Sequence, residues 1–323
     1  MSETKNIMNK KPPLVILTGP TAVGKTDLSI ALAKRIDGQI ISADSMQVYQ
    51  DMSIGTAKIT PEEMDGVRHY LVDEIPPETT FNVVEFQRRA KEAIQDIYRQ
   101  GKIPIVVGGT GFYIQALLYD IDFAPHEEKE EYREYLTQLG QERGKEYLHD
   151  QLVKVDPRYA ASVHSNNVKR VIRALEYYHE TGEKLSSHNE EERQKVSDYN
   201  FAYLVLTHDR EVLYDRINRR VDLMMKEGLL TEVTRLKERG LTRDMTSMQA
   251  IGYREFVDYF DGNRSLDDTV ELIKQDTRHF AKRQLTWFRR EKDVIWLSKK
   301  DHPKTEDLLE FILGILKERA IIG

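Results

Sequence analysis

The sequence predicts an α/β fold in which a parallel sheet with flanking helices carries a helical insertion domain. Three apolar runs, residues 14–18, 39–43 and 103–107, have the length and β-branched character of buried strands. The segments between them have apolar residues at helical spacing. Strands that alternate with helices in this order are typical of a doubly wound parallel sheet. The strand pattern stops near residue 122 and resumes at residues 203–206, which predicts the insertion.

The first strand leads into residues 19–26, whose letters GPTAVGKT fit the phosphate-binding pattern G-x-x-x-x-G-K-[ST]. Apolar residues at helical spacing follow in 27–36, so strand, glycine loop and helix come in the order of a P-loop NTPase-like core. This order aims free backbone N–H groups and the positive helix end at one point, which favours a bound di- or polyphosphate. A tight turn that matches by chance is the alternative. The predicted phosphate-binding residues are Gly19, Pro20, Thr21, Ala22, Val23, Gly24, Lys25 and Thr26.

Four polar side chains are expected at this site. Lys25 supplies a point charge for phosphate oxygens, and the Thr26 hydroxyl is placed to hold Mg²⁺. The second strand delivers Asp44 at its carboxyl end, where ligands bind in open parallel sheets. A carboxylate that only caps a turn is the alternative for Asp44. The turn at 108–111, GGTG, either lets the backbone and the Thr110 hydroxyl approach a ligand or is simply tight.

The remaining elements follow from periodicity and end signals. Residues 46–77 mix glycines with prolines and are predicted to be irregular, and Asn82 caps a helix at 83–100. A helix begins at Asn166 or Asn167 and ends at Gly182, before a charged, exposed stretch at 190–198. Later helices are predicted at 211–226, 229–239, 266–291 and 305–319, and a strand at 294–297. The predicted domains are 1–121, the first part of the core, 122–200, the helical insertion, and 201–323, the second part of the core with basic helices.

Composition limits the function classes. The chain has 323 residues and a net charge of −6, which argues against a general attraction to nucleic acid and leaves that question to local basic patches. It has no cysteine, so disulfides and cysteine-bound zinc are excluded. Residues 1–13 lack the apolar stretch of a signal peptide, and no apolar run reaches membrane-spanning length. We therefore expect a cytoplasmic protein with no membrane partner.

An ordered set of motifs resembles that of the tRNA dimethylallyltransferases, also called tRNA isopentenyltransferases. Besides the phosphate loop, the motifs are DSMQVY at 44–49, IGTAK at 54–58, GGTGFY at 108–113, RVIRALE at 170–176, GYR at 252–254 and KRQLTWFR at 282–289. The match spans nearly the whole chain, and the later motifs are not those of general P-loop proteins. Without cysteines the eukaryotic zinc finger is absent, so the resemblance implies a bacterial-type member.

The resemblance implies transfer of a dimethylallyl group from its diphosphate to the exocyclic amine of the adenine on the 3′ side of the tRNA anticodon. It makes Asp44 the base that takes the amine proton, and it places Thr110 and Arg220 near the diphosphate. Such chemistry needs the departing diphosphate stabilised by the phosphate loop, by Mg²⁺ and by nearby arginines. Arg216 and Arg219 are then surface residues or tRNA contacts.

The resemblance also implies binding of the tRNA anticodon stem-loop, with the target adenine extruded from its stack. Between Asp276 and Lys292 the long helix carries six Lys or Arg residues against two acids. A solvated helix face is the usual meaning of such a run, but the family match favours an RNA footprint. Trp287 has core packing as its alternative role, and we expect a monomer. The implied tRNA contacts are Asp44, Ser45, Met46, Gln47, Lys169, Arg170, Arg173, Gln249, Gly252, Tyr253, Arg254, Lys282, Arg283, Gln284, Thr286, Trp287 and Arg289.

Two other functions remain open. The first is a nucleotide or small-molecule kinase that uses ATP at the same loop, with the arginines of 216–220 as phosphate clamps. No further strand ends in a Walker-type Asp besides Asp44, which disfavours this kinase. The second is a non-catalytic RNA-binding protein with a relic phosphate loop. An intact Lys25 and Thr26 beside Asp44 disfavours that alternative.

Overall fold

The computed structural model describes residues 11–123 and 130–323. Most of the polar start of the chain, and residues 124–129 of the predicted insertion, lie outside the described residues. The chain divides into two compact units, one formed by residues 1–118 and 198–323 and the other by residues 119–197. Among the described residues, no helix is both long and apolar enough to cross a membrane.

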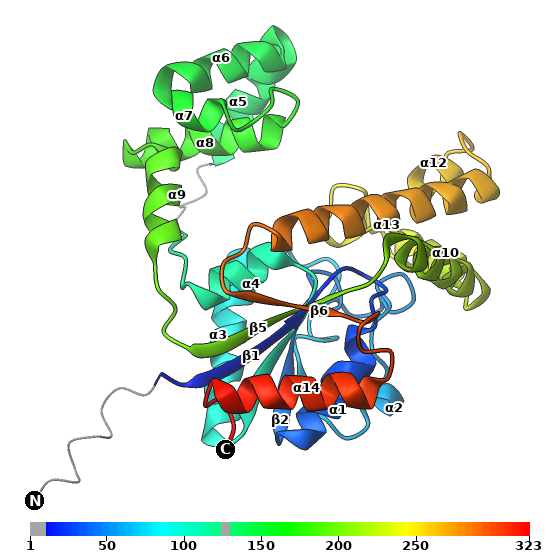
Figure 1. The fold of residues 1–323 in the computed structure, drawn as a ribbon. Helices are drawn as coiled ribbons and strands as arrows, with labels where there is room; N and C mark the ends of the chain where they lie inside the picture. The colour runs from blue at the N-terminus through cyan, green and yellow to red at the C-terminus, as the bar shows by residue number, and fades with distance from the viewer. Residues whose placement is uncertain (1–10, 124–129) are drawn as a thin grey trace, which may run out of the picture. The chain divides into compact units, whose positions relative to one another are not determined.

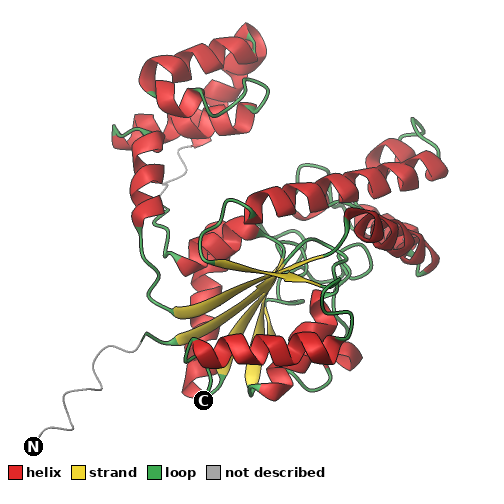
Figure 2. Ribbon diagram, viewed as in Figure 1, coloured by secondary structure: helices red, strands yellow, loops and turns green. Residues whose placement is uncertain are grey.

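The first unit is built on a six-stranded sheet with the strand order β3-β2-β4-β1-β5-β6 (Figure 2). Every neighbouring pair is parallel. The strands are β1 (Pro13–Thr18), β2 (Gly38–Ala43), β3 (His69–Tyr70), β4 (Ile103–Gly108), β5 (Asn200–Thr207) and β6 (Val294–Ser298). The predicted α/β fold with a P-loop-like parallel sheet is thereby confirmed.

The register of the strands determines which segments meet at the carboxyl edge of the sheet. Thr18 at the end of β1 pairs with Gly108 at the end of β4, and Gly108 pairs in turn with Ala43 at the end of β2. On its other side Thr18 pairs with Val205 of β5. The segments that follow β1, β2 and β4 therefore leave the sheet side by side.

Helices cover both faces of the sheet (Figure 1). The helices α1 and α14 bury leucines and isoleucines in one core cluster with β1 and β5, and α3 lies on the opposite face. Burying one Leu or Ile side chain fully stabilises the fold by about 1.5–3 kcal/mol. The positions of these residues along each helix therefore determine which face of the helix packs on the sheet. The helices of this unit are α1 (Lys25–Arg35), α2 (Pro61–Met64), α3 (Val83–Arg99), α4 (Gly111–Leu118), α10 (Arg210–Lys226), α11 (Leu229–Glu238), the 3₁₀ turn η1 (Ser247–Gln249), α12 (Phe256–Phe260), α13 (Leu266–Phe288) and α14 (Thr305–Glu318).

The second unit consists of helices in its described residues. They are α5 (Glu130–Arg143), α6 (Lys145–Val155), α7 (Pro157–Ala160), α8 (Val168–Thr181) and α9 (Leu185–Gln194). Leu148, Leu152 and Val171 are fully buried and form a core separate from that of the sheet. Arg133 of α5 pairs with the buried Glu176 of α8 at 2.7 Å. Gly182 ends α8 with φ 71°, as its sequence position predicts.

Four elements differ from the prediction. The segment 46–77 contains α2 and the two-residue β3, which are too short to show a period. The helix α4 starts inside the glycine-rich turn at 108–111, where glycines hide a helical signal. The charged stretch 190–198 is predicted to be exposed, but its first half belongs to α9. The helix predicted at 266–291 ends at residue 288.

Candidate active site

The loop between β1 and α1 has the backbone of a phosphate cradle. Gly19, Ala22 and Gly24 have positive φ angles of 145°, 62° and 89°. At Gly19 a side chain is impossible, because its Cβ would lie 2.5 Å from the carbonyl oxygen of Leu206. Ala22 lies in the left-handed region, which typically costs about 1–3 kcal/mol for a residue other than glycine. The loop is therefore held in a strained shape by its surroundings.

Lys25 is the first residue of α1 and folds back over the loop. Its Nζ donates hydrogen bonds to the carbonyl oxygens of Gly19 at 3.0 Å and Pro20 at 2.8 Å. The pKa of Lys25 is lowered to about 8, mainly by burial, with Asp44 opposing the shift and the charge of Arg220 adding to it. A protonated amine that is destabilised in this way gains from an anion placed beside it.

Asp44 follows β2 directly and caps its own turn. Its Oδ1 accepts hydrogen bonds from the backbone N–H of Met46 at 2.9 Å and of Gln47 at 3.4 Å. Burial raises the pKa of Asp44, and these hydrogen bonds and the charge of Lys25 offset only part of the rise. The capping role considered for this residue is therefore real. It does not exclude chemistry, because a raised pKa makes the carboxylate a stronger base.

The loop after β4 lies against the end of β2. The backbone N–H of Thr110 donates to the carbonyl oxygen of Ala43 at 3.2 Å. A Cβ at Gly108 would overlap the Ala43 backbone, and one at Gly111 would overlap the Trp287 ring. Neither glycine has a positive φ angle. These glycines are therefore needed for close approach to the rest of the protein, and not for a left-handed turn.

Gln284 of α13 joins the two loops of the site. Its Oε1 accepts from the backbone N–H of Thr21 at 2.9 Å, and its Nε2 donates to the carbonyl oxygen of Gly109 at 3.0 Å. The Thr18 hydroxyl adds a bond of 2.7 Å to Gly108 on the neighbouring strand. Gln284 is only 6% exposed. The predicted tRNA contact of Gln284 is therefore corrected, since both of its polar groups are used inside the protein.

The arginines of α10 divide between the phosphate loop and the surface. Arg220 is half-buried, and its pKa is lowered by burial and by the charge of Arg216. Arg219 is exposed and pairs with Asp215 at 2.5 Å. Arg216 is exposed, as predicted for a surface residue, and its guanidinium also lies 3.8 Å from the position that a Cβ on Gly24 would occupy. Arg216 and Arg220 therefore face the loop, and Arg219 does not.

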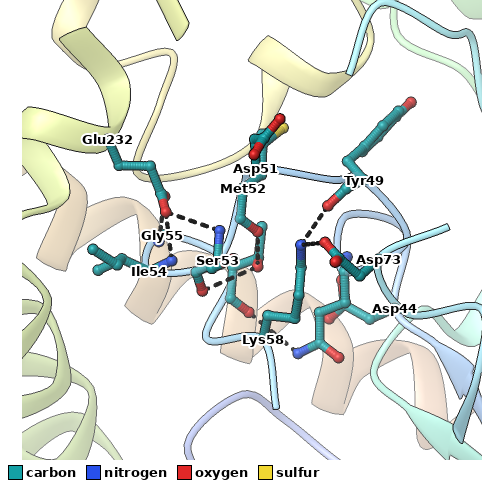
Figure 3. Close-up of polar contacts among 12 residues, drawn as sticks. Asp44, Tyr49, Asp51, Met52, Ser53, Ile54, Gly55, Lys58, Asp73 and Glu232 are labelled. Carbon is teal, nitrogen blue, oxygen red and sulfur yellow. Dashed lines mark hydrogen bonds and ion pairs between the residues drawn. The ribbon is translucent and has the colours of Figure 1, made fainter. Parts of the chain in front are cut away.

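A buried carboxylate that the sequence did not single out supports the neighbouring loop (Figure 3). Glu232 of α11 is 6% exposed. Its Oε2 accepts from the backbone N–H of Ser53 and Ile54, both at 2.9 Å. Its Oε1 accepts from the N–H of Gly55 at 3.1 Å and from the Tyr253 hydroxyl at 2.6 Å. One carboxylate thus fixes three consecutive backbone groups from a helix far along the chain.

Gln47 connects this loop to the Asp44 turn. Its Nε2 donates to the carbonyl oxygens of Thr56 at 3.2 Å and Ala57 at 3.1 Å. Lys58, which follows Ala57 in the loop, has a nearly buried side chain. Its Nζ pairs with Asp73 at 2.6 Å (Figure 3). Gln47 therefore has a structural role in addition to its implied contact with tRNA.

Two residues of the GYR motif, Gly252 and Tyr253, are also corrected, because they are buried inside the protein. Tyr253 is fully buried, and a Cβ on Gly55 would lie 2.5 Å from its ring. The N–H of Gly252 donates to the buried Glu255 at 2.8 Å. Arg254 pairs with Glu255 and with Asp276, each at 2.7 Å. The buried Gly252 and Tyr253 therefore support the 53–58 loop, while Arg254 is half-buried and its implied tRNA contact stays a prediction.

The exposed members of the predicted tRNA set lie mainly on α13. Lys282, Arg283 and Arg289 are exposed and form no ion pair with any described residue. Trp287 is half-buried, with its ring centroid 6.1 Å from that of Phe112, and Thr286 bonds back to its own helix. A hollow of about 420 Å³ opens along this face, lined by His279, Lys282, Arg283, Thr286, Trp287 and Arg290.

The other predicted contacts have varied exposure. Gln249 is exposed, while Ser45 and Met46 beside Asp44 are half-buried. In the second unit, Lys169 and Arg170 of α8 are exposed and Arg173 is half-buried. Burial lowers the pKa of Arg173, although Glu176 and Glu180 oppose the shift.

The fold and site define an α/β protein with a P-loop at the carboxyl edge of its sheet, where cations meet one desolvated carboxylate. A model of the IPP transferase family matches residues 47–291. Because this match covers most of the chain, the chain belongs to the IPP transferase family. The resemblance drawn from the sequence motifs is confirmed.

Curated relatives and solved structures agree with the family. The chain is 60% identical to a tRNA dimethylallyltransferase of Lachnoclostridium phytofermentans, over 96% of this chain and 99% of that protein. It is 51% identical to one of Bacillus cereus, over 96% of this chain and 98% of that protein. The full-length tRNA isopentenylpyrophosphate transferase of Bacillus halodurans superposes with a TM-score of 0.72 at 46% identity, over 96% and 98% of the two chains. A eukaryotic dimethylallyltransferase acting on tRNA gives a TM-score of 0.76 at 32% identity, over 89% and 74%.

Replacing Glu232 by Gln should destabilise the protein. The new side-chain amide has a donor where the carboxylate of Glu232 has an acceptor, so at least one buried N–H or hydroxyl loses its partner. Such a loss costs about 1–3 kcal/mol. Urea denaturation of Glu232→Gln should show this decrease in the free energy of unfolding. The matched control is Glu238→Gln, at an exposed position of the same helix. Equal stability of both variants would show that the carboxylate is not what holds the loop.

Proposed function

We propose that this chain transfers a dimethylallyl group from dimethylallyl diphosphate to the exocyclic amine of the adenine next to the 3′ side of the tRNA anticodon, and releases diphosphate. The observation that carries this proposal is the meeting of the phosphate loop, Lys25 and Asp44 at one sheet edge in a member of the IPP transferase family. Relatives with this activity in their names cover nearly the whole chain. The chemistry of the site supports the same assignment.

The leaving group is the first requirement of this reaction. The bond between the allylic carbon and a diphosphate oxygen breaks, and its electron pair leaves with the diphosphate. The loop N–H groups, Lys25 and Arg220 are proposed to stabilise that charge. Lys25 would exchange its bonds to the Gly19 and Pro20 carbonyl oxygens for bonds to the anion.

The nucleophile is the second requirement. The lone pair of an adenine amine is delocalised into the ring, so attack on the allylic carbon needs the amine proton to be taken. Asp44 is the group proposed to take it, because it lies next to the phosphate loop and its raised pKa favours proton uptake. The Thr110 hydroxyl, held near Asp44 by the bond between Thr110 N–H and Ala43, is proposed to contact the diphosphate.

Mg²⁺ fits the residues at the loop. The Thr26 side chain is exposed at the start of α1 and forms no hydrogen bond with a described residue. No group of three or more His, Cys, Asp or Glu that could hold a metal occurs among the described residues. Thr26 and the diphosphate oxygens would therefore share the ion with water, which is the usual manner for Mg²⁺. The ion would neutralise charge on the departing diphosphate.

The tRNA is proposed to bind along the basic face of α13. Its exposed cations have no carboxylate partner among the described residues, and aromatic and hydroxyl groups lie between them. A basic face with an aromatic ring suits RNA phosphates and an unstacked base. The α8 residues Lys169, Arg170 and Arg173 are proposed as a further part of the RNA surface. The protein is expected to act as a monomer in the cytoplasm, where tRNA is modified.

The kinase alternative is disfavoured by the strand next to the P-loop. β1 lies between β4, which ends in Gly108 and is followed by Gly109, and β5, which ends in Thr207, so neither neighbouring strand ends in a metal-binding Asp. The two functions differ in donor and acceptor. Labelled dimethylallyl diphosphate with total tRNA should give labelled tRNA, and labelled ATP without RNA should label no small-molecule acceptor. The reverse result would establish the kinase.

Replacing Lys25 or Thr26 by Ala should decrease the rate of transfer by about 10²–10³, the typical loss for one preorganised electrostatic contact. Single-turnover rates at saturating substrates measure the effect. Lys34→Ala is the control, since Lys34 is in the last turn of the same helix and is exposed. If Lys25→Ala turns over like Lys34→Ala, the loop does not hold the reacting diphosphate.

Asp44→Asn should decrease the rate by about 10²–10⁴ and leave the fold intact, because an Asn oxygen can still cap the turn. The pH dependence gives a second test. Asp44 acts only when deprotonated and its pKa is raised, so the wild-type rate should rise with pH through a value above that of an ordinary Asp. The variant should lose this rise. An unchanged rate and pH profile would leave Asp44 as a cap only.

The salt dependence of tRNA binding tests the α13 face. Lys282→Ala, Arg283→Ala and Arg289→Ala should each reduce the log–log slope by about 0.7–0.9, the contribution of one phosphate contact. Lys317→Ala on the exposed side of α14 is the control. If all four variants keep the wild-type slope, the RNA lies elsewhere, and the α8 cations are the next candidates.

A further inference from the structure

Two cations that the predicted phosphate site does not include lie against its loop. We propose that Arg216 and Lys299 form a second clamp of the diphosphate site, far in sequence from the glycine loop and brought to it by the sheet. This inference rests on the proposed function, because it assigns further residues to the same diphosphate. The sequence predicts no role for Lys299, and it predicts a phosphate contact for Arg216 only in the kinase alternative.

The sheet carries Lys299 to the site. β6 pairs in parallel with β5, with Thr207 opposite Ser298 at their carboxyl ends. The backbone N–H of Lys299 extends this pairing by donating to Thr207 at 3.0 Å. Lys299 is therefore the first residue beyond the last strand of the sheet. It leaves the sheet at the same edge as the phosphate loop.

The Lys299 side chain then reaches the loop itself. Its Nζ lies 2.8 Å from the position that a Cβ on Gly24 would occupy. The two terminal nitrogens of Arg216 lie 3.8 and 4.0 Å from the same position. Gly24 directly precedes Lys25 and Thr26, the residues proposed to hold the diphosphate and its metal. Two cations from different elements thus converge on the glycine at the centre of the cradle.

Helix α10 explains why Arg216 is placed here with Arg220. Residues four apart lie one turn apart on the same face of a helix, so these two side chains point the same way. Arg219 is exposed and paired with Asp215. Its ion pair, and not its spacing, distinguishes it from Arg216 and Arg220, which form none with a described residue. Lys300, next to Lys299, is likewise exposed and pairs with Asp209 at 3.3 Å.

The charges at the site are not balanced by the protein. Arg216, Arg220 and Lys299 form no ion pair with any described residue. Burial is the largest cause of the lowered pKa values of Arg220, Lys299 and Lys25; the charge of Arg216 lowers the pKa of Arg220 and of Lys299 further, and the charge of Arg220 that of Lys25. Asp27 opposes the shifts of Arg220 and Lys299 but makes no contact with them at ion-pair distance. Like charges held together in this way are unfavourable until an anion joins them.

Phosphate oxygens are the chemistry that these two cations would bind, and they can come from the diphosphate or from the tRNA backbone. The diphosphate is favoured because the cations converge on Gly24, inside the cradle. The basic face of α13, by contrast, belongs to a different set of side chains. Arg216 supplies a planar fork for two oxygens and Lys299 a point charge. Both would bind the diphosphate before and after the allylic bond breaks.

The test is binding of inorganic diphosphate, with Mg²⁺, to the full chain without tRNA. Arg216→Ala and Lys299→Ala should each raise its Kd at least about tenfold, which corresponds to about 1.4 kcal/mol. Lys299→Arg should restore most of the affinity. The matched controls, Arg219→Ala and Lys300→Ala, should bind like wild type. Thermal unfolding shows whether each variant is folded, and folding is expected because Arg216 is exposed and Lys299 is only half-buried.

Three other outcomes separate a failure of this inference from a failure of the proposed function. If Arg216→Ala and Lys299→Ala bind diphosphate like wild type while Lys25→Ala does not, the clamp is absent and the proposed function stands. If they weaken only the binding of tRNA, measured without diphosphate, the cations hold a backbone phosphate and the assignment to diphosphate fails. If the wild-type chain transfers no dimethylallyl group but the variants lose diphosphate binding, the proposed function fails and the clamp stands.

Discussion

The parallel register of β1, β4 and β2 is the constraint on which the site depends. Thr18, Gly108 and Ala43 are registered partners across these three adjacent strands. The next residue along each strand therefore emerges at one place, and these are Gly19, Gly109 and Asp44. A slip of one residue in any pair would move its side chains to the other face of the sheet. The phosphate loop and the carboxylate are neighbours because of this register, although 25 positions separate Gly19 from Asp44 in the sequence.

The register places the loops, but side chains from the second half of the chain hold them. Gln284 satisfies one backbone group in each of two loops, and Glu232 satisfies three consecutive N–H groups of a third. A buried backbone group without a partner costs about 1–3 kcal/mol, so each of these side chains determines a local conformation. Gln47, at the Asp44 turn, hydrogen-bonds to residues 56 and 57 of the loop that Glu232 holds, and so links the two segments. The first half of the chain supplies the phosphate loop and Asp44, and α11 and α13 supply side chains that hold these loops and their neighbour.

Local pattern was sufficient for the fold and for the centre of the site. A β-branched run followed by GPTAVGKT predicts β1, the phosphate loop and α1, because all of its signals lie within about twenty residues. The roles of Gln284, Tyr253 and Arg216 could not be predicted in this way. Each depends on a partner far along the chain, and a motif does not say whether its polar residues face a ligand or the protein. Lys299 gave no signal at all, since a lysine after a short strand is ordinary surface sequence.

Asp44 shows how a structural and a chemical role can share one carboxylate. Its Oδ1 is fixed by two backbone N–H groups, so the carboxylate cannot rotate freely. Its Oδ2 has no hydrogen bond with any described residue and is left to accept a proton. The capping bonds stabilise the charged form and would by themselves make Asp44 a weaker base, yet burial outweighs them and raises its pKa. In the proposed reaction the turn would orient this base, and the loss of water around it would increase its basicity.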